Sequence, residues 1–394
     1  MQLPAGFSFS SVAAGIKASG RPDLALVECS PGTKAAAVFT RNRVIAAPVQ
    51  VGRTALKLSR GAIGAVVVNS GNANCATGPA GLNACEKVCR ETAVLLGVPF
   101  EQVFPSSTGI IGVPLPVKKI VSALPALIST PQATEQQACQ FARTIMTTDT
   151  RPKLAWTSVR SRGRECKVLG IGKGSGMIHP KLATMLVYLF TDAKANPGDL
   201  KGTLREICDE TFNCISVDGD TSTNDTVLLM ASGKSNFDMS GHINASFRNA
   251  LLHVCASLAQ QIVSDGEGVQ HVIRLSIERA RNRAEAMQIA RAVAHSPLVK
   301  TAWAGADPNW GRILAACGNS GVTIDPAKVD IFIGGQKVCS KGEAWSFDES
   351  KAHAHLSQPV CDLRVRLGRG SASVRFYTTD LTTEYVRINA DYST

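Results

Sequence analysis

The chain has 394 residues, of which 44% are hydrophobic and 19% charged, the balance of an ordinary water-soluble globular protein too long for a single small core. Its formal net charge is +11, which suits either anionic small substrates or plain solubility. Aromatic residues make up only 5% and do not interleave with the basic ones, which argues against a nucleic-acid partner. No run of apolar residues approaches membrane-spanning length, and the N-terminal sequence does not resemble a signal peptide. We therefore expect a cytoplasmic protein with no membrane partner.

Helix-like and strand-like segments alternate along most of the chain, the order typical of an α/β protein. Apolar spacing predicts strands over Ala62–Val68, Met185–Phe190 and Arg274–Glu278, and helices over Leu82–Leu96, Leu200–Cys214, Phe247–Ile262 and Arg283–Ala294. We expect a surface loop over Ser129–Gln136. From about Ser296 the pattern changes to short strands, such as Val329–Ile333 and Val374–Thr378. These changes predict a larger N-terminal domain over residues 1–285 and a smaller C-terminal domain over 286–394.

The twelve cysteines are dispersed and contain no Cys-x-x-Cys motif. Cys85 and Cys89 lie four residues apart in a predicted helix, which favours core packing in a reducing compartment over disulfides or zinc. His353 and His355 are two residues apart, as on one face of a strand, and no recognised zinc spacing links them to Cys361. We therefore expect a solvated strand face there and no metal site.

The segment Lys173–Asp192 joins a glycine-rich approach to a continuous apolar run at the junction Ala183–Thr184. The predicted strand Met185–Phe190 would place the hydroxyl of Thr184 at the mouth of a rigid element. Cleavage of the bond before Thr184 would also give this residue a free α-amine. A hydroxyl beside its own α-amine is the arrangement that an N-terminal nucleophile needs.

The glycines of this segment do not fit the known phosphate-binding motifs. A Walker loop needs Ser or Thr after Gly-Lys, whereas Gly174 follows Gly172-Lys173. The dinucleotide fingerprint does not fit either, and no lipase-like elbow surrounds Ser175. The sequence thus predicts no nucleotide site in this segment.

Four polar turns rich in Thr, Ser, Asn and Gly each follow an apolar segment: Asn69–Asn74, Ser106–Gly109, Thr147–Thr150 with Arg151-Pro152-Lys153, and Asp218–Asp225. Singly, each is typical of a structural turn. Together, turns at strand ends can supply the backbone N–H groups and hydroxyls of an oxyanion hole.

These turns belong to a longer ordered set of motifs. In chain order the set is Ser70-Gly71-Asn72-Ala73-Asn74, Ser107-Thr108-Gly109, Thr147-Thr148-Asp149-Thr150, Lys173-Gly174-Ser175-Gly176-Met177, Ala183-Thr184-Met185-Leu186, Asp218-Gly219-Asp220-Thr221-Ser222-Thr223-Asn224-Asp225, Asp265-Gly266-Glu267-Gly268, Asp307-Pro308-Asn309-Trp310-Gly311-Arg312 and Asn389-Ala390-Asp391-Tyr392-Ser393-Thr394. The chain resembles the ornithine acetyltransferase family, the bifunctional glutamate N-acetyltransferases of arginine biosynthesis. The resemblance spans essentially the whole chain.

The resemblance implies an α/β fold of the N-terminal-nucleophile-like type, a layered sandwich shared with certain aminopeptidases, with a smaller α+β C-terminal domain. It implies a precursor that cuts itself between Ala183 and Thr184 into an α chain, Met1–Ala183, and a β chain that begins at Thr184. The expected assembly is an α2β2 heterotetramer. No cofactor and no metal are implied.

The implied activity is that of an acyltransferase, which moves acetyl from N-acetyl-L-ornithine to L-glutamate by a ping-pong mechanism through acetyl-Thr184. Whether acetyl-CoA is a second donor is left open. By resemblance, the Thr108 side chain and the Gly109 N–H form the oxyanion hole. The family's substrate-binding positions correspond to Thr150, Lys173, Thr184, Glu267, Asn389 and Thr394. Lys173 suits a substrate carboxylate and Glu267 an ammonium group, although without the resemblance they would read as ordinary loop residues.

Two stretches depart from the family's usual pattern. His179-Pro180-Lys181-Leu182 stands where Pro-Asn-Met is common before the Ala-Thr pair, and Val269-Gln270-His271 stands where a small residue, Thr and Lys are common. Two other functions compete with the acetyltransferase. One is a self-processing aminopeptidase or amidase of the same architecture, in which water is the acceptor. The other is a non-catalytic basic binding protein, against which the scattered charge argues.

Overall fold

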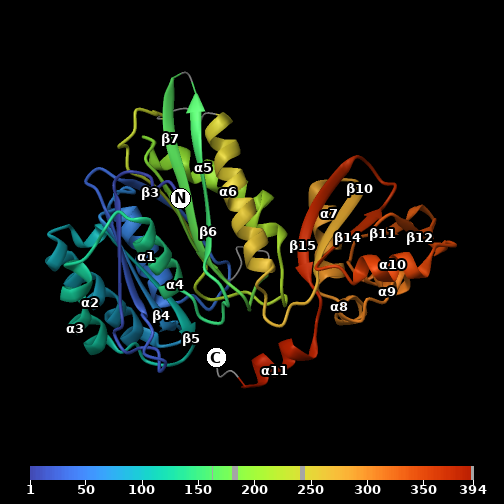
Figure 1. Cartoon of the computed structure of the whole chain (residues 1–394), viewed down its shortest axis with the longest axis horizontal. Coiled ribbons are helices and arrows are strands. Elements are labelled where there is room, and N and C mark those ends of the chain that lie inside the picture. Colours follow the sequence, from blue (N-terminus) through green and yellow to red (C-terminus); the bar gives the residue numbers. More distant parts are fainter. Residues whose placement is uncertain (162, 180–184, 240–244, 392–394) are drawn as a thin grey trace. The chain divides into compact units, whose positions relative to one another are not determined.

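The computed structural model describes residues 1–161, 163–179, 185–239 and 245–391 (Figure 1). The chain divides into two compact units. The first unit contains Met1–Asn213 and Asp220–Ile262, and the second contains Cys214–Gly219 and the chain from Val263 onward.

The first unit contains two β-sheets. The four-stranded sheet has the order β1-β2-β4-β5, formed by Phe7–Val12, Leu24–Cys29, Ala65–Asn72 and Val103–Ile110. The five-stranded sheet has the order β3-β9-β8-β7-β6, formed by Lys34–Phe39, Thr226–Ala231, Leu186–Thr191, Arg164–Lys173 and Lys153–Ser161. The pairs β4–β5 and β8–β9 are parallel and the other pairs are antiparallel.

These two sheets face each other across one apolar core. Phe9 and Val27 of the four-stranded sheet belong to the same buried cluster as Leu169, Tyr188 and Phe190 of the five-stranded sheet. The alternation of side chains along each strand leaves a second apolar face on each sheet. Both sheets therefore need a further layer to cover that face.

Helices supply the outer layers. The helices are α1 (Ala47–Leu58), α2 (Gly78–Leu96), α3 (Val117–Ile128), α4 (Glu135–Thr144), α5 (Pro197–Glu210) and α6 (Ala245–Val263). Cys89 of α2 and Leu124 of α3 pack with Leu26 and Val67 on the outer face of the four-stranded sheet. On the five-stranded sheet, α6 packs so closely that a Cβ on Gly170 would lie 2.6 Å from Leu258 Cδ1. The first unit is thus a four-layer α/β/β/α sandwich, and the layered α/β fold predicted above is confirmed.

The second unit contains a six-stranded mixed sheet of order β13-β12-β11-β14-β10-β15. Its strands are β10 (Val272–Ala280), β11 (Asp330–Ile333), β12 (Gln336–Ser340), β13 (Glu343–Ala344), β14 (Val360–Arg366) and β15 (Ala372–Thr379). Its helices are α7 (Arg283–Ala294), α8 (Pro297–Ala304), α9 (Trp310–Gly318), α10 (Glu349–Leu356) and α11 (Thr383–Asp391). The core joins Ile289, Trp303 and Leu356 of the helices to Leu275 and Val365 of the strands.

Most of the predicted elements are present, with shifted ends. The helix predicted over Arg283–Ala294 is α7, and the helix ending at Leu96 stops at Gly97, which has φ +66°. The polar turns Asn69–Asn74 and Ser106–Gly109 are largely strand, because Asn69–Asn72 pair with Ser107–Ile110. α4 begins at Glu135, so the last two residues of the loop expected over Ser129–Gln136 are helical.

The prediction of a strand at His353 and His355 is wrong, because both lie in α10. The Asp348 side chain accepts a hydrogen bond from Lys351 N and caps the start of this short helix. His353 Nδ1 lies 2.9 Å from Ala306 O, and His355 Nε2 accepts from Asp362 N. Within the described ranges, no group of three or more His, Cys, Asp or Glu is placed to hold a metal ion.

Three further features bear on the organisation of the chain. All twelve cysteines are free, and all except Cys139 are buried. The long continuous segment of the second unit begins at Val263, before the boundary expected at residue 285, because β10 pairs with β14 and β15 and therefore belongs to the second unit. Among the described residues, none of the helices has the length and apolar character needed to cross a membrane.

Candidate active site

Strand ends from both sheets of the first unit meet at one place. β7 ends at Lys173, which pairs with Leu186 at the start of β8, and Leu186 pairs with Thr226 at the start of β9. Lys173 Nζ donates a hydrogen bond of 3.1 Å to Oγ1 of Thr108, near the end of β5 in the other sheet. The open end of the sandwich therefore gathers residues that are far apart in the sequence.

Gly109 owes its identity to the close approach of β4 and β5. It has φ +134°, and a Cβ at this position would lie 2.3 Å from Gly71 C and 2.5 Å from Asn72 N. Real Cβ atoms do not approach backbone so closely, and this backbone conformation favours glycine. The register shifts here, since Asn72 faces both Thr108 and Ile110. This irregularity places a backbone segment beside the buried hydroxyl of Thr108.

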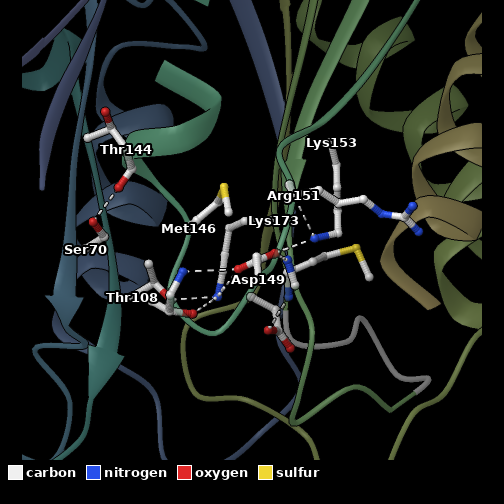
Figure 2. A network of polar contacts seen from close by, with 12 residues as sticks. Ser70, Thr108, Thr144, Met146, Asp149, Arg151, Lys153 and Lys173 are labelled. Atoms are coloured by element: carbon white, nitrogen blue, oxygen red, sulfur yellow. Dashed lines mark hydrogen bonds and ion pairs between the residues drawn. The ribbon is translucent and has the colours of Figure 1, made fainter. Parts of the chain in front are cut away.

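Two buried lysines surround one buried carboxylate (Figure 2). Lys153 Nζ donates to Asp149 Oδ1 at 2.6 Å, and Lys173 Nζ lies 4.0 Å from Asp149 Oδ2. Lys153 is fully buried and Lys173 is 5% exposed. Lys173 Nζ also donates to Thr147 Oγ1 at 2.9 Å. Because a buried charge without a partner is costly, the three charges depend on one another.

Asp149 is held in its ionised form by this arrangement. Burial by itself raises the pKa of the carboxyl, but Lys173 and Lys153 outweigh it and the pKa lies below its usual range. Backbone N–H groups of Gly174 and Thr147 add hydrogen bonds of 2.7 and 3.1 Å to the carboxylate. Asp149 thus ties the turn before β6 to the end of β7 and fixes the position of Lys173.

The turn that carries Thr147 and Asp149 is anchored from the N-terminal part of the chain. Lys17 Nζ donates to the carbonyl oxygens of Thr144 and Met146 at 3.0 and 2.8 Å, and Ser70 Oγ donates to Thr144 O. Burial, and after it the neighbouring Arg21, lowers the pKa of Lys17 to about 8. A cation on the last carbonyls of α4 is a favourable helix end.

Asp225 holds the start of β8. Its Oδ1 accepts a hydrogen bond of 3.0 Å from the backbone N–H of Met185, the residue that follows Thr184. Burial raises the pKa of the Asp225 carboxyl well above its usual range, and the Met185 N–H does not outweigh it. The adjacent Asn224 donates to Ala73 O at 2.7 Å and Ser107 O at 2.9 Å, which joins β9 to the ends of β4 and β5.

The structure brings together only some of the predicted site residues. Thr108, Gly109 and Lys173 lie at the strand ends of the first unit, and Thr150 is exposed directly after Asp149. In the second unit, Asn389 Nδ2 donates to Glu267 Oε2 at 2.9 Å. Ala183, Thr184 and Thr394 lie outside the described residues.

Sequence reasoning did not assign roles to Thr147, Asp149, Lys153 or Asp225. Thr147, Asp149 and Asp225 lie in polar turns that are visible in the sequence, but the turns alone do not indicate what each side chain does. Lys153 closes the turn that begins at Thr147, but nothing in the sequence predicts its burial, because a lysine at the start of a strand is normally solvated. In the structure it is buried, and its Nζ donates to Asp149 Oδ1 and to Arg151 O.

Comparison with known proteins supports one family. The chain matches the ArgJ family over residues 8–394. It is 45% identical to the arginine biosynthesis bifunctional protein ArgJ of Methylococcus capsulatus, with 99% of this chain and 96% of that protein covered. The protein of the same name from Pseudomonas fluorescens is 42% identical, with 99% and 96% covered.

Solved structures of similar sequence were also found. The arginine biosynthesis bifunctional protein ArgJ of Bacillus halodurans is 42% identical, covers 51% of this chain and 96% of its own, and has a TM-score of 0.49. Ornithine acetyltransferase from Mycobacterium tuberculosis, complexed with ornithine, is 35% identical with 45% and 93% covered and a TM-score of 0.40. The ordered motif blocks, the match over residues 8–394 and the near-complete coverage of relatives above 40% identity agree, and the chain belongs to the ArgJ family.

Proposed function

We propose that this protein is a self-processing acetyltransferase of arginine biosynthesis, which moves the acetyl group of N-acetyl-L-ornithine to L-glutamate through an acetylated Thr184. Family membership supports this activity, because the relatives carry the name arginine biosynthesis bifunctional protein. One observation carries the proposed site. The buried contact of Lys173 with Thr108 lies at the strand ends where Met185, the residue after Thr184, is held by Asp225.

The first proposed step is cleavage of the chain. The Thr184 hydroxyl attacks the carbonyl carbon of Ala183, the C–N bond breaks, and the acyl group moves to the hydroxyl oxygen as an ester. Water then hydrolyses the ester and leaves a carboxylate on Ala183 and a free α-amine on Thr184. Asp225 is suited to this step because its bond to the Met185 N–H fixes the backbone one residue after the scissile bond.

The second proposed step is acetyl transfer. The α-amine of Thr184, with a reference pKa of about 7.7–8.0, takes the proton of its own hydroxyl. The oxygen attacks the acetyl carbonyl, and the amine of ornithine leaves with that proton. The glutamate amine then attacks the acetyl ester and regenerates Thr184. The charged oxygen that forms in each half would accept hydrogen bonds from Thr108 O–H and Gly109 N–H.

The contacts of Lys173 suggest a role beyond substrate binding. Its ammonium donates to Thr108 Oγ1, so that oxygen acts as an acceptor and its own hydrogen is available to point elsewhere. A hydroxyl that accepts from a cation is a stronger donor, because hydrogen bonds in a chain polarise one another. We therefore assign Lys173 the task of orienting and strengthening the Thr108 donor.

The remaining substrate-binding positions follow from family membership. Thr150, Lys173, Glu267, Asn389 and Thr394 are proposed to contact the substrate, with the Glu267 carboxylate suited to an ammonium group and Asn389 Nδ2 holding that carboxylate. An α2β2 assembly of the two cleaved chains and acetyl-CoA as a second acetyl donor belong to the same proposal.

The test uses Thr184→Ala with Thr184→Ser as the matched control. Thr184→Ala should remain one chain of 41.6 kDa and transfer no acetyl group, whereas Thr184→Ser keeps a hydroxyl and should still be cut. Acetyl transfer from N-acetylornithine should require glutamate. Acetate release at the same rate without glutamate would instead favour the amidase, and an active, normally cut Thr184→Ala variant would contradict the proposal.

A further inference from the structure

A groove in the first unit has no part in the chemistry described above. Its cavity volume is about 1010 Å³. The floor is β3, the edge strand of the five-stranded sheet, and the walls are α1 and α5. The lining residues Ala35–Phe39 and Leu56 carry apolar side chains, beside the polar backbone of this edge strand.

Six cationic side chains line the groove: Arg41, Arg53, Lys57, Arg60, Lys201 and Arg205. The one acidic residue in the lining, Asp209, accepts a hydrogen bond from Asn213. Lys57 follows Arg53 by four positions on α1, and Arg205 follows Lys201 by four on α5. Side chains four apart lie on the same helix face, so each helix turns two cations toward the groove.

These cations are not neutralised by the surrounding protein. Arg53 donates to Thr40 O at 3.0 Å and lies over the Phe39 ring, but it has no carboxylate partner in the described part of the chain. The other five cations likewise form no ion pair with any described residue. Like charges four apart on a helix repel each other and destabilise it. A concave surface with this charge attracts and concentrates anions.

The charge and size of the groove select among anions. Six cations against one carboxylate exceed what glutamate or another small carboxylate would neutralise. Arginine forks match phosphate oxygens in pairs, and the groove offers four arginines. The volume lies at the upper end of small-molecule sites, large enough for a nucleotide. We propose that this groove binds a small ligand with at least two phosphate groups, whose uncharged part lies along β3.

Two macromolecular occupants fit less well. Phe39 is the only aromatic residue of the lining, and Arg53 lies over its ring, so stacked nucleic-acid bases find no platform. A second copy of this chain carries the same net charge of +11, which opposes association through a basic face. The site goes beyond the proposed acetyl transfer and does not depend on it.

The experiment compares two variants that lose the same charge. Lys57→Gln combined with Arg205→Gln removes one cation from each wall, whereas Lys87→Gln combined with Arg375→Gln removes exposed cations outside the groove. Calorimetric titration with inorganic pyrophosphate, ADP and coenzyme A gives the dissociation constants. We expect saturable binding of at least one probe, about tenfold or more weaker in the groove variant and nearly unchanged in the control.

The three probes separate the sources of phosphate. Binding of pyrophosphate as tight as that of ADP and coenzyme A would support recognition of phosphates alone, whereas tighter ADP or coenzyme A would support a nucleotide. The proposal is overturned if no probe saturates, or if both variants weaken binding equally. Binding of a short RNA oligomer without any of the probes, or a change of oligomeric state only in the groove variant, would also overturn it. Thermal unfolding of the wild type and both variants serves as the folding control.

Discussion

Lys173 lies between Thr108, Thr147 and Asp149, so its charge acts on groups of the protein as well as on a substrate. If it works through Thr108, removing both groups should cost little more than removing Thr108 alone. We expect Lys173→Met to lower kcat for acetyl transfer by about a hundredfold, and Lys173→Met with Thr108→Val to match Thr108→Val. Steady-state kinetics of the four proteins tests this. Additive losses, or a loss confined to KM, would assign Lys173 to substrate binding only.

Asp225 is a buried carboxyl whose hydrogen bond to the Met185 N–H defines its proposed role in self-cleavage. Burial raises the pKa of its carboxyl and so favours the neutral form, and Asp225→Asn keeps the acceptor for Met185 N–H without a charge. We expect this variant to self-cleave within a few-fold of the wild-type rate. Asp225→Ala leaves a buried N–H unpaired, which costs about 1–3 kcal/mol, and should slow cleavage by about tenfold or more. Equal slowing of both variants in a time course on denaturing gels would show that the ionised form is needed.

At the scale of elements, β4 and β5 approach so closely at Gly109 that no side chain fits. We expect Gly109→Ala to lose about a hundredfold or more of the transfer rate, because the strand end must shift and with it the Thr108 donor. Gly202→Ala is the matched control, since a Cβ there meets nothing within 4 Å and lies in α5. It should gain about 0.5–1 kcal/mol of stability without loss of activity. Normal activity of Gly109→Ala would contradict the geometry of this strand end.

Helices and strands were predictable where the apolar pattern extends over many residues. α7 and α6 follow helical spacing over many residues, and the buried strand after Thr184 stands out as an unbroken apolar run. The eight-residue helix α10 has too few turns for its spacing to be distinguished from a strand, so His353 and His355 were placed wrongly. The pairing of β10 with β14 and β15 joins distant segments, and no local pattern reveals it.

The candidate site was predictable only where its residues lie in recognisable motif blocks. The motif blocks name Thr108, Gly109 and Lys173, and the structure places them together. Lys17 and Lys153 were not predicted, because their roles depend on burial. Lys17 binds a carbonyl far along the chain, and Lys153 binds a carboxylate across a turn. A sequence shows that a lysine is present, but only the fold shows that water has been removed from it.

At the scale of the whole molecule, buried lysines couple stability to pH. Lys300 of the second unit donates to Val217 O and to Thr379, and burial lowers its pKa from 10.5 to about 8. Between these values the unfolded chain binds more protons than the folded one, so the free energy of unfolding should rise with pH. The rise from this group is at most about 1.4 kcal/mol per pH unit.

Urea unfolding at pH 7.5 and 9.5, chosen as roughly the span of this titration, provides the measurement. Wild type should gain more stability over this interval than Lys300→Met, whereas Lys341→Met, which changes an exposed lysine of the same unit, should follow wild type. An unchanged pH slope in Lys300→Met would mean that Lys300 keeps an ordinary pKa in the folded protein.

The central claim is that the chain must break before Thr184 to become an acetyl carrier. Intact mass under denaturing conditions, before and after N-acetylornithine is added without glutamate, tests it most directly. We expect two fragments, Met1–Ala183 and one that begins at Thr184, with the second heavier by one acetyl group after the donor is added. An uncut chain that still transfers acetyl, or an acetyl group on the first fragment, would contradict the account.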